Sequence, residues 1–245
     1  MKNKSEFVVF CEPRTGSYSL ISRLHSAHDI TCHEELFKEG ELELYPWHRR
    51  KMKRWTAAKR NNSPDEFLSE LRALNPHKAF GFKLFNQHVN RVKPLRSYLN
   101  KPSIKKVVLY RDPLEVYASL LRARKTNKWT KPISAKNEVE EAPKVRFTPE
   151  SIMAFATSYN AFLENAFKIS QSSESFAISY SHIEQESRVN ALLNFLGSSA
   201  SIEDVHSEYA KQYTGSLEEA FENWNELNDF INSTVVFRDM PAGEK

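Results

Sequence analysis

A short apolar run at Phe7–Cys11 leads through a small-residue loop into a segment with helical spacing, and this pattern constrains the fold most strongly. Pro13 ends the strand-like run, and Gly16 permits a tight turn. Ser17 is a suitable N-cap for a helix predicted over Ser17–Ala27. Such a junction predicts an anion site, because the unpaired amides and the dipole of the helix N-terminus point to one place.

Arg14 lies in this loop and adds a planar cation that suits phosphate or sulfate oxygens. The loop differs from the ATP-binding motif G-x-x-x-x-G-K-[ST]. It contains one glycine, no lysine after that glycine, and an arginine before it. The sequence therefore predicts an anion-binding loop of a different class from the ATP-binding loop.

Predicted strands and helices alternate along the rest of the chain. Apolar runs predict strands at Ile30–Cys32, Ala79–Phe85, Lys106–Tyr110 and Ser175–Ser179. A helix is predicted after Ser63, where Glu66 completes a capping box. Further helices are predicted near Pro94–Leu99, at Pro113–Lys125, from Thr148 to about Ser170, and at Ser216–Ile231, and one more is predicted to end at Gly197. The alternation predicts one α/β domain over residues 1–245, with three layers and a central, mostly parallel sheet flanked by helices. We expect a flexible polar insertion around 127–147 and a frayed tail after Phe237.

The composition is that of an ordinary globular protein, with 40% apolar residues, 27% charged residues and a net charge of +4. This mild basic excess suits an anionic small ligand, and no nucleic-acid partner is expected. No run approaches the roughly 18 apolar residues of a membrane span, and the N-terminus lacks a signal-peptide core, so a cytoplasmic protein is expected. Cys11 and Cys32 are predicted to be free thiols rather than a disulfide.

A second strand–helix junction follows Lys106–Tyr110. Arg111 lies at its turn, and Ser119 comes eight residues later (119 − 111 = 8). Asp112 could pass for a magnesium-binding carboxylate after a strand, but its position next to Arg111 argues against this and leaves a helix N-cap as the alternative. Two anion-binding junctions in one domain indicate a ligand with two separate anionic ends.

These motifs resemble those of sulfotransferases. Arg14-Thr-Gly-Ser looks like their 5′-phosphosulfate loop, and Arg111 and Ser119 have the spacing of their 3′-phosphate motif. With Glu35-Leu-Phe, Gly81–Gln87 and Arg111–Trp129, the chain is most similar to bacterial carbohydrate sulfotransferases of the trehalose type and, more loosely, of the nodulation-factor type. The resemblance fades after about residue 185. It implies a P-loop-like fold and metal-independent sulfonyl transfer to a hydroxyl, with 3′-phosphoadenosine-5′-phosphosulfate (PAPS) as donor and adenosine 3′,5′-bisphosphate (PAP) as product.

The resemblance also implies roles for individual residues. The donor would be bound at its 5′ end by Arg14, Thr15, Gly16, Ser17 and Tyr18, and at its 3′-phosphate by Arg111 and Ser119. Tyr18 departs from the small threonine usual at its position. The implied catalytic residues are Glu35, Arg14, Lys83 and His88, and the implied substrate-binding residues are Glu35, Gln87, Arg122 and Trp129.

Several of these assignments leave alternatives open. Glu35 is the expected general base, but it could be a solvated carboxylate beside Glu34, which we expect at the surface. His88 is a rival base, or a loop histidine bonded to the backbone. Lys83 lies on an apolar strand and needs an anionic partner, so we expect it to point into the donor site. Trp129 either stacks on a sugar or anchors the insertion.

Other functions are also open at this point. A carbohydrate or glycolipid acceptor and a homodimer follow from the resemblance alone. A nucleotide-dependent kinase or phosphotransferase with a degenerate P-loop is one alternative. A non-catalytic nucleic-acid or membrane binder is another, because the basic segment 49–60 interleaves cations with Trp55. A solvated helix face is the more frequent explanation of such a segment, and a third alternative is that it lines the acceptor cleft and prefers acidic glycans.

Overall fold

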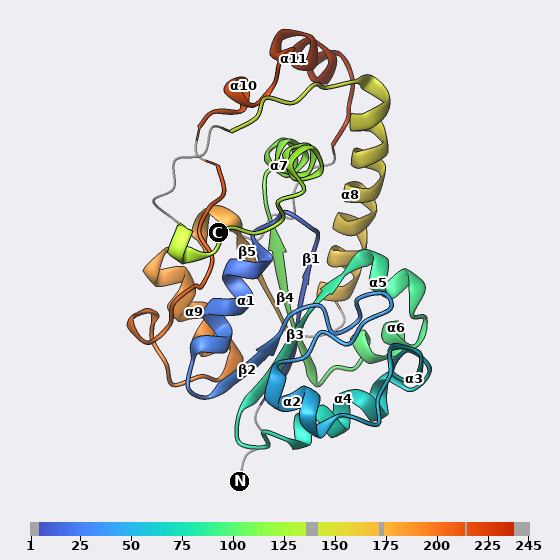
Figure 1. Cartoon of the computed structure of the whole chain (residues 1–245), viewed down its shortest axis with the longest axis vertical. Coiled ribbons are helices and arrows are strands. Elements are labelled where there is room, and N and C mark those ends of the chain that lie inside the picture. Colours follow the sequence, from blue (N-terminus) through green and yellow to red (C-terminus); the bar gives the residue numbers. More distant parts are fainter. Residues whose placement is uncertain (1–4, 136–141, 172–173, 214, 238–245) are drawn as a thin grey trace.

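The computed structural model describes residues 5–135, 142–171, 174–213 and 215–237 (Figure 1). Five strands form one sheet in the order β2-β3-β1-β4-β5, and every neighbouring pair is parallel. This confirms the predicted α/β, P-loop-like architecture. The strands are β1 (Glu6–Cys11), β2 (Ile30–His33), β3 (Ala79–Phe85), β4 (Ile104–Tyr110) and β5 (Ser175–Ser179).

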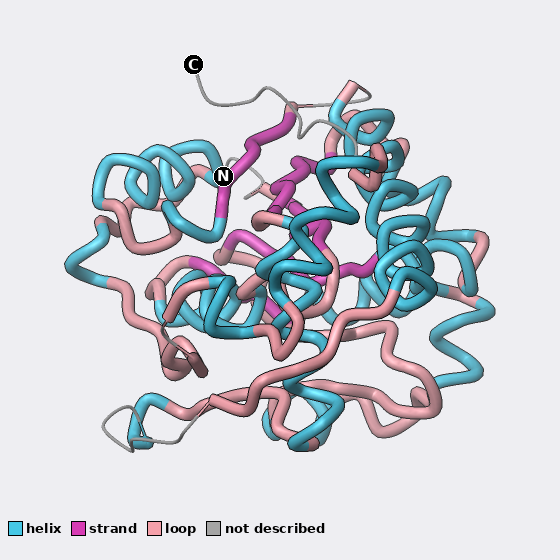
Figure 2. The backbone as a smooth tube through the Cα atoms, turned by 90° about the horizontal axis from the view of Figure 1, so that it is seen from above, coloured by secondary structure: helices cyan, strands magenta, loops and turns pink. Residues whose placement is uncertain are grey.

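Helices cover both faces of the sheet, as Figure 2 shows in a view from above. Helices α1 (Ser17–Ser26) and α9 (Glu186–Leu196) pack on the face that presents Phe7 and Val9. Helices α4 (Pro64–Ala73), α6 (Pro94–Leu99) and α8 (Pro149–Ser170) pack on the opposite face, which presents Val8 and Phe10. Because both faces are buried, the strands are apolar without alternation, as is usual for parallel sheets.

A third apolar cluster lies beyond the sheet, at the top of Figure 1. It is formed by α7 (Pro113–Thr126), α10 (Leu217–Ala220), α11 (Trp224–Ser233) and the start of α8. The remaining elements are α2 (Pro46–Lys51), α3 (Ala57–Asn62), α5 (Asn86–Arg91) and the 3-10 turns η1 (Ile133–Ala135), η2 (Tyr180–His182) and η3 (Ile202–Asp204).

Parallel pairing determines where the chemistry can be located. Phe10 lies opposite Leu84 on one side and Val108 on the other, so β1, β3 and β4 end at the same edge of the sheet. The loops that follow these strands therefore meet at that carboxyl edge, which is where ligands bind in open α/β sheets. Cys11 and Cys32 are buried free thiols, as predicted. No helix among the described residues is long and apolar enough to cross a membrane.

Two predicted helix starts are wrong in detail. Gly16, not Ser17, is the N-cap of α1, and its φ of 88° is in the left-handed region that glycine adopts without strain. Ser63 makes no side-chain cap, since its ψ of 61° lies outside the extended region usual for an N-cap. Its amide ends α3 by donating to Lys59 O, and Glu66 pairs with Arg54 instead of closing a capping box.

The predicted helix Ser216–Ile231 is also wrong, since it is two helices separated at Phe221. The amide of Val145 donates to Ala220 O, and the amide of Glu222 donates to Val145 O (both 2.9 Å). These long-range hydrogen bonds hold the backbone in an extended conformation at a place where local propensity favours a helix. Residues 136–141 of the expected insertion and the tail after Phe237 lie outside the described residues.

Candidate functional site

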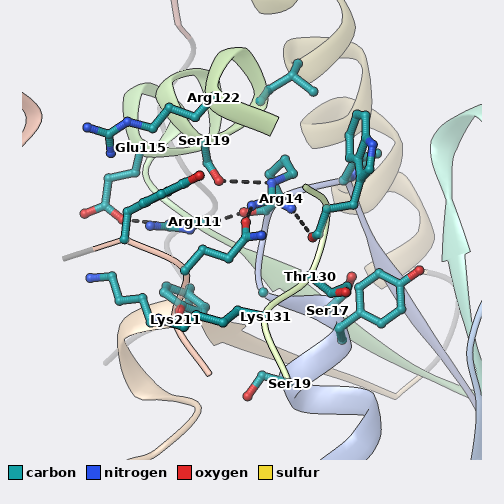
Figure 3. A pocket seen from close by; sticks show the side chains of 18 of the residues that line it. Arg14, Ser17, Ser19, Arg111, Glu115, Ser119, Arg122, Thr130, Lys131 and Lys211 are labelled. Atoms are coloured by element: carbon teal, nitrogen blue, oxygen red, sulfur yellow. Dashed lines mark hydrogen bonds and ion pairs between the residues drawn. The ribbon is translucent and has the colours of Figure 1, made fainter. Parts of the chain in front are cut away.

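A cavity of about 900 Å³ lies at the carboxyl edge of the sheet (Figure 3). Strand–helix junctions from distant parts of the chain form its wall. Thr15, Lys83 and His88 do not line it. The predicted site residues that do line it are Arg14, Gly16, Ser17, Tyr18, Glu35, Gln87, Arg111, Ser119, Arg122 and Trp129.

The loop after β1 presents a helix N-terminus to this cavity. The first hydrogen bond of α1 runs from Leu20 N to Gly16 O (3.2 Å), so the amides that precede Leu20 have no partner within the helix. Arg14 has a φ of 72°, a conformation that costs a non-glycine residue on the order of 1–3 kcal/mol. Thr15 is fully buried, and its hydroxyl donates to Glu12 O (2.7 Å), so its side chain faces away from the cavity.

The Arg14 guanidinium joins the two predicted anion motifs. Its Nε donates to Ser119 Oγ (3.0 Å), and its Nη atoms donate to Trp129 O and Gln212 Oε1. Burial, followed by the nearby charge of Arg111, lowers the pKa of Arg14 to about 10. The sequence motifs assign Arg14 and Ser119 to opposite ends of a donor, whereas the structure brings them into direct contact.

Arg111 lies next to this contact. Its Nε donates to Glu115 (2.6 Å), its Nη1 donates to Arg14 O (3.3 Å), and its guanidinium lies 4.3 Å from the Tyr180 ring centroid. Sequence reasoning missed Tyr180, although its position directly after β5 at the same sheet edge is a usable signal. The Asp112 side chain accepts from the amides of Leu114 and Glu115, so it is a helix N-cap.

Glu35 belongs to a buried ionic cluster beside the cavity. Lys83 Nζ lies 2.7 Å from Glu34 Oε2 and 3.4 Å from Glu35 Oε1. The ammonium also lies 3.6 Å from the Tyr18 ring centroid. Lys83 is fully buried and off the cavity wall, so it lies behind Tyr18 rather than pointing into the donor site as expected.

Glu34 is not at the surface, contrary to expectation. Its side chain is 16% exposed and contacts Lys83. Burial raises the pKa of Glu34 to about 7, although the charge of Lys83 opposes this shift. The ammonium of Lys83, which is buried on β3, pairs with this carboxylate. The sequence shows two adjacent glutamates and does not reveal which of them makes the closer contact.

His88 is buried and bonded to the backbone. Its Nδ1 accepts the amide of Phe85 (3.2 Å), and its Nε2 lies 3.8 Å from Glu35 Oε2. Burial, followed by the charge of Arg91, lowers the pKa of His88 to about 3. The imidazole is therefore neutral, and the hydrogen bond at Nδ1 places its proton on Nε2, facing Glu35.

The other predicted substrate residues lie at different parts of the cavity. Gln87, at the start of α5, is exposed and lines the cavity. Arg122 Nε donates to Pro143 O (3.0 Å), and its guanidinium lies 5.1 Å from the Tyr213 ring centroid. Trp129 is 45% exposed, and its carbonyl accepts from Arg14.

Two segments from distant parts of the chain close one side of the cavity. Pro132 and Tyr209 form an antiparallel bridge, and Ala210 N donates to Lys131 O (2.9 Å). Residues 209–213 line the cavity, but sequence reasoning did not place them there. They lie outside the recognisable strand–helix junctions, and no local pattern marks them.

The basic segment 49–60 is only partly a solvated face. Arg60 is fully buried and donates to the carbonyls of Leu36 (2.6 Å), Glu41 (2.5 Å) and Lys38 (2.9 Å). Burial lowers the pKa of Arg60 to about 10, with a further contribution from Arg91. Arg60 therefore holds the loop that follows Glu35 instead of facing a polyanion.

No family model and no curated protein matches the sequence. Among solved structures, a sulfotransferase domain from the curacin biosynthetic pathway is similar, with a TM-score of 0.49, 14% identity, and coverage of 90% of this chain and 83% of that one. A sulfotransferase from Alicyclobacillus acidocaldarius gives 0.48 and 14%, with 99% of each chain covered. A mouse sulfotransferase complexed with PAP gives 0.42 and 14%, with 83% of this chain and 62% of that one covered. These similarities concern the arrangement of strands and helices and assign no role to a residue of this chain.

Proposed function

We propose that this chain is a sulfotransferase that uses PAPS as donor and a hydroxyl, of a carbohydrate or glycolipid, as acceptor. One observation carries the proposal. The Arg14 loop and the Arg111–Ser119 junction, which the sequence marks as separate anion motifs, converge on one cavity (Figure 3). Glu35 also lines this cavity.

The residues present fit a donor with two anionic ends. A volume of about 900 Å³ is in the range of nucleotide-sized ligand sites. Unpaired amides at the start of α1 and the Arg14 guanidinium would hold the 5′-phosphosulfate. Arg111 and Ser119 would hold the 3′-phosphate, with Arg14 between the two groups because it contacts both Ser119 and Arg111. When bound, PAPS supplies a sulfonyl group on a phosphate leaving group.

Glu35 is the residue we assign as general base. Glu35 lines the cavity, and Lys83 and His88 contact its carboxylate from the buried side. The loop is fixed next to it, since the Glu35 amide donates to Glu43 (3.1 Å). His88 is a poorer candidate, because Nδ1 already accepts a backbone proton and Nε2 carries its own. We infer that His88 and Lys83 orient Glu35.

The phosphotransferase alternative finds less support at the same site. A magnesium-dependent enzyme would need a free carboxylate after β4, but the Asp112 side chain already accepts two amides of α7. The loop after β1 also lacks the lysine that reaches the β- and γ-phosphates in ATP-binding loops.

Thermal denaturation with PAP, and separately with ATP and magnesium at the same concentration, tests the donor. PAP at about 100 times its Kd should stabilise the protein by roughly 2.7 kcal/mol, and ATP should not. Arg111→Ala should abolish the PAP shift. Arg50→Ala, which removes an exposed arginine outside the cavity, should preserve it. A shift with ATP–magnesium alone would support the phosphotransferase instead.

Glu35→Gln tests the base. Sulfonyl transfer should fall by roughly 10²-fold or more, because a positioned general base contributes about that much, while the PAP shift is retained. The rate of PAP release from PAPS in the presence of an accepted alcohol measures this. Undiminished transfer in Glu35→Gln would remove Glu35 from the role.

A further inference from the structure

The cavity has two chemically different ends. We propose that the end beside Glu35 is an acceptor subsite, walled by Tyr18 and Tyr209, for a ring-shaped alcohol that carries no negative charge. This inference rests on the proposed function. Of the substrate-binding residues that the sequence resemblance implies, it keeps Glu35 at the acceptor and places Arg122 and Trp129 outside the acceptor subsite.

Two aromatic rings form the wall of this subsite. The ring centroids of Tyr18 and Tyr209 are 5.3 Å apart at an angle of 56°, and both residues line the cavity. Lys83 fixes the Tyr18 ring from the protein side, and the bridge to Pro132 fixes Tyr209. Paired rings held in this way offer apolar faces on which the C–H face of a ring-shaped ligand can pack.

The charges around these rings are predominantly negative. Glu34, Glu35, Glu41 and Glu43 contact two ammonium groups, those of Lys38 and Lys83. Lys38 lines the cavity, but its Nζ lies 3.1 Å from Glu41 and 3.8 Å from Glu43. The ammonium of Lys83 is buried off the cavity wall, and that of Lys38 already contacts two carboxylates, so the four carboxylates outnumber these two ammonium groups and disfavour an anionic acceptor.

The opposite end of the cavity carries the arginines of the two anion motifs. Figure 3 shows Arg122 on the far side of Arg14 from Ser17 and Ser19, the residues that flank Tyr18 in the chain. Arg122 contacts Pro143 and Tyr213, whereas Glu35 contacts Lys83, His88 and Glu43, so none of these partners among the described residues is common to both. The arginines of the cavity, which are Arg14, Arg111, Arg122 and Arg124, belong to the two anion motifs and to α7, and Glu115 and Glu184 line the cavity with them, whereas Lys131 and Lys211 flank the bridge that fixes Tyr209.

This division separates the two substrates by charge. A donor with several negative charges is drawn to the cationic end, and the carboxylates beside Glu35 repel a second anion. An acceptor with its own carboxylate or phosphate would compete for the donor's end instead of approaching Glu35. An uncharged alcohol has no such competition and gains the aromatic wall.

A matched pair of sugars tests the charge selectivity. We would compare sulfonyl transfer from PAPS to methyl α-D-glucuronamide and to methyl α-D-glucuronide, which both lack the C6 hydroxyl and differ in the charge at C6, with methyl α-D-glucopyranoside as the neutral reference that keeps this hydroxyl. The glucuronamide should be preferred over the glucuronide on the order of 10-fold in kcat/KM, as expected for one charge repelled near a surface. Glu43→Gln should reduce this preference severalfold, whereas Glu39→Gln, an exposed glutamate off the cavity wall, should leave it unchanged.

Substitutions at Tyr209 test the wall. Tyr209→Leu should raise KM for the glucoside about fivefold or more with a smaller change in kcat, and Tyr209→Phe, which keeps the ring, should restore it. Equal use of the glucuronamide and the glucuronide, preference for the glucuronide, or an unchanged KM in Tyr209→Leu would overturn the inference.

Thermal stabilisation of the same protein by PAP distinguishes a failure of the acceptor subsite from a failure of the proposed function. If PAP stabilises the protein but none of these sugars is sulfonated or raises the melting temperature of the PAP complex, the acceptor subsite is wrong and the donor assignment survives. If PAP gives no stabilisation, the proposed function fails and the acceptor inference fails with it.

Discussion

Gly16→Ala should damage the anion loop for two separable reasons. Gly16 has a φ of 88°, which an alanine adopts only with strain. A Cβ atom at this position would also lie 2.1 Å from Cδ2 and 2.3 Å from Cε2 of Tyr180. The Tyr180 ring would then have to leave the loop, and with it the contact between this ring and the Arg111 guanidinium.

Gly197→Ala is a matched control for the first of these reasons. Gly197 ends α9 with a φ of 76°, but nothing lies within 4 Å of a Cβ atom built there. Left-handed strain should cost each variant about 1–2 kcal/mol. Overpacking against Tyr180 should add about 1–3 kcal/mol to Gly16→Ala alone. We therefore expect Gly16→Ala to be the less stable variant by that difference.

Urea denaturation of both variants measures the stabilities, and PAP-induced thermal shifts measure the loop. Gly197→Ala should keep the PAP shift, and Gly16→Ala should lose most of it. In a Tyr180→Ala background the additional cost of Gly16→Ala should largely disappear, as a double-mutant cycle would report. Equal costs for the two glycines, or a full PAP shift in Gly16→Ala, would refute the role given to the Tyr180 contact.

Two further predictions concern the supports of Glu35. Arg60→Leu should lower the free energy of unfolding by about 3 kcal/mol, because three backbone carbonyls lose a charged donor; urea denaturation checks this, and a change below about 0.5 kcal/mol would contradict it. The lowered pKa of His88 means that the unfolded chain binds its proton more readily, so stability is complete above about pH 6.5 and is lost as pH falls toward 3. Between pH 7 and 5 this should cost about 2 kcal/mol, and His88→Asn should flatten that part of the stability–pH curve.

Sequence patterns were sufficient for the sheet because its strands are buried on both faces. Continuous apolar runs such as Ala79–Phe85 have few other stable places in a domain of this size, and the structure confirms that strand at both ends. The break at Phe221 was not predictable in the same way. It depends on hydrogen bonds to Val145, a residue 76 positions earlier (221 − 145 = 76), and local propensity contains no information about that contact.

The candidate site was likewise predictable in part: the positions of its residues could be predicted, and the directions of their side chains could not. Arg14, Glu35 and Arg111 each follow a strand, and parallel pairing brings such residues to one edge whatever the details of packing. Side-chain direction was less predictable. Lys83 lies on a strand whose two faces are both covered, so strand alternation could not tell whether it faced the cavity or a buried carboxylate. Tyr209 reaches the cavity only through a bridge between two irregular segments.

The basic segment shows why charge in a sequence is a weak guide to polyanion binding. Arg60 donates to Leu36 O, Lys38 O and Glu41 O, and Arg49 donates to Leu42 O (2.6 Å), so both hold the loop that carries Glu35. Neutralising the whole segment would therefore disturb the proposed base together with any binding surface. Polyanion binding is tested cleanly by substitutions at the exposed Arg50, Lys51 and Lys53, since none of them makes a carbonyl contact with that loop among the described residues. Retained transfer activity alongside lost polyanion binding in such variants would show two functions in one chain, whereas loss of both in Arg60→Leu would show only that the loop had moved.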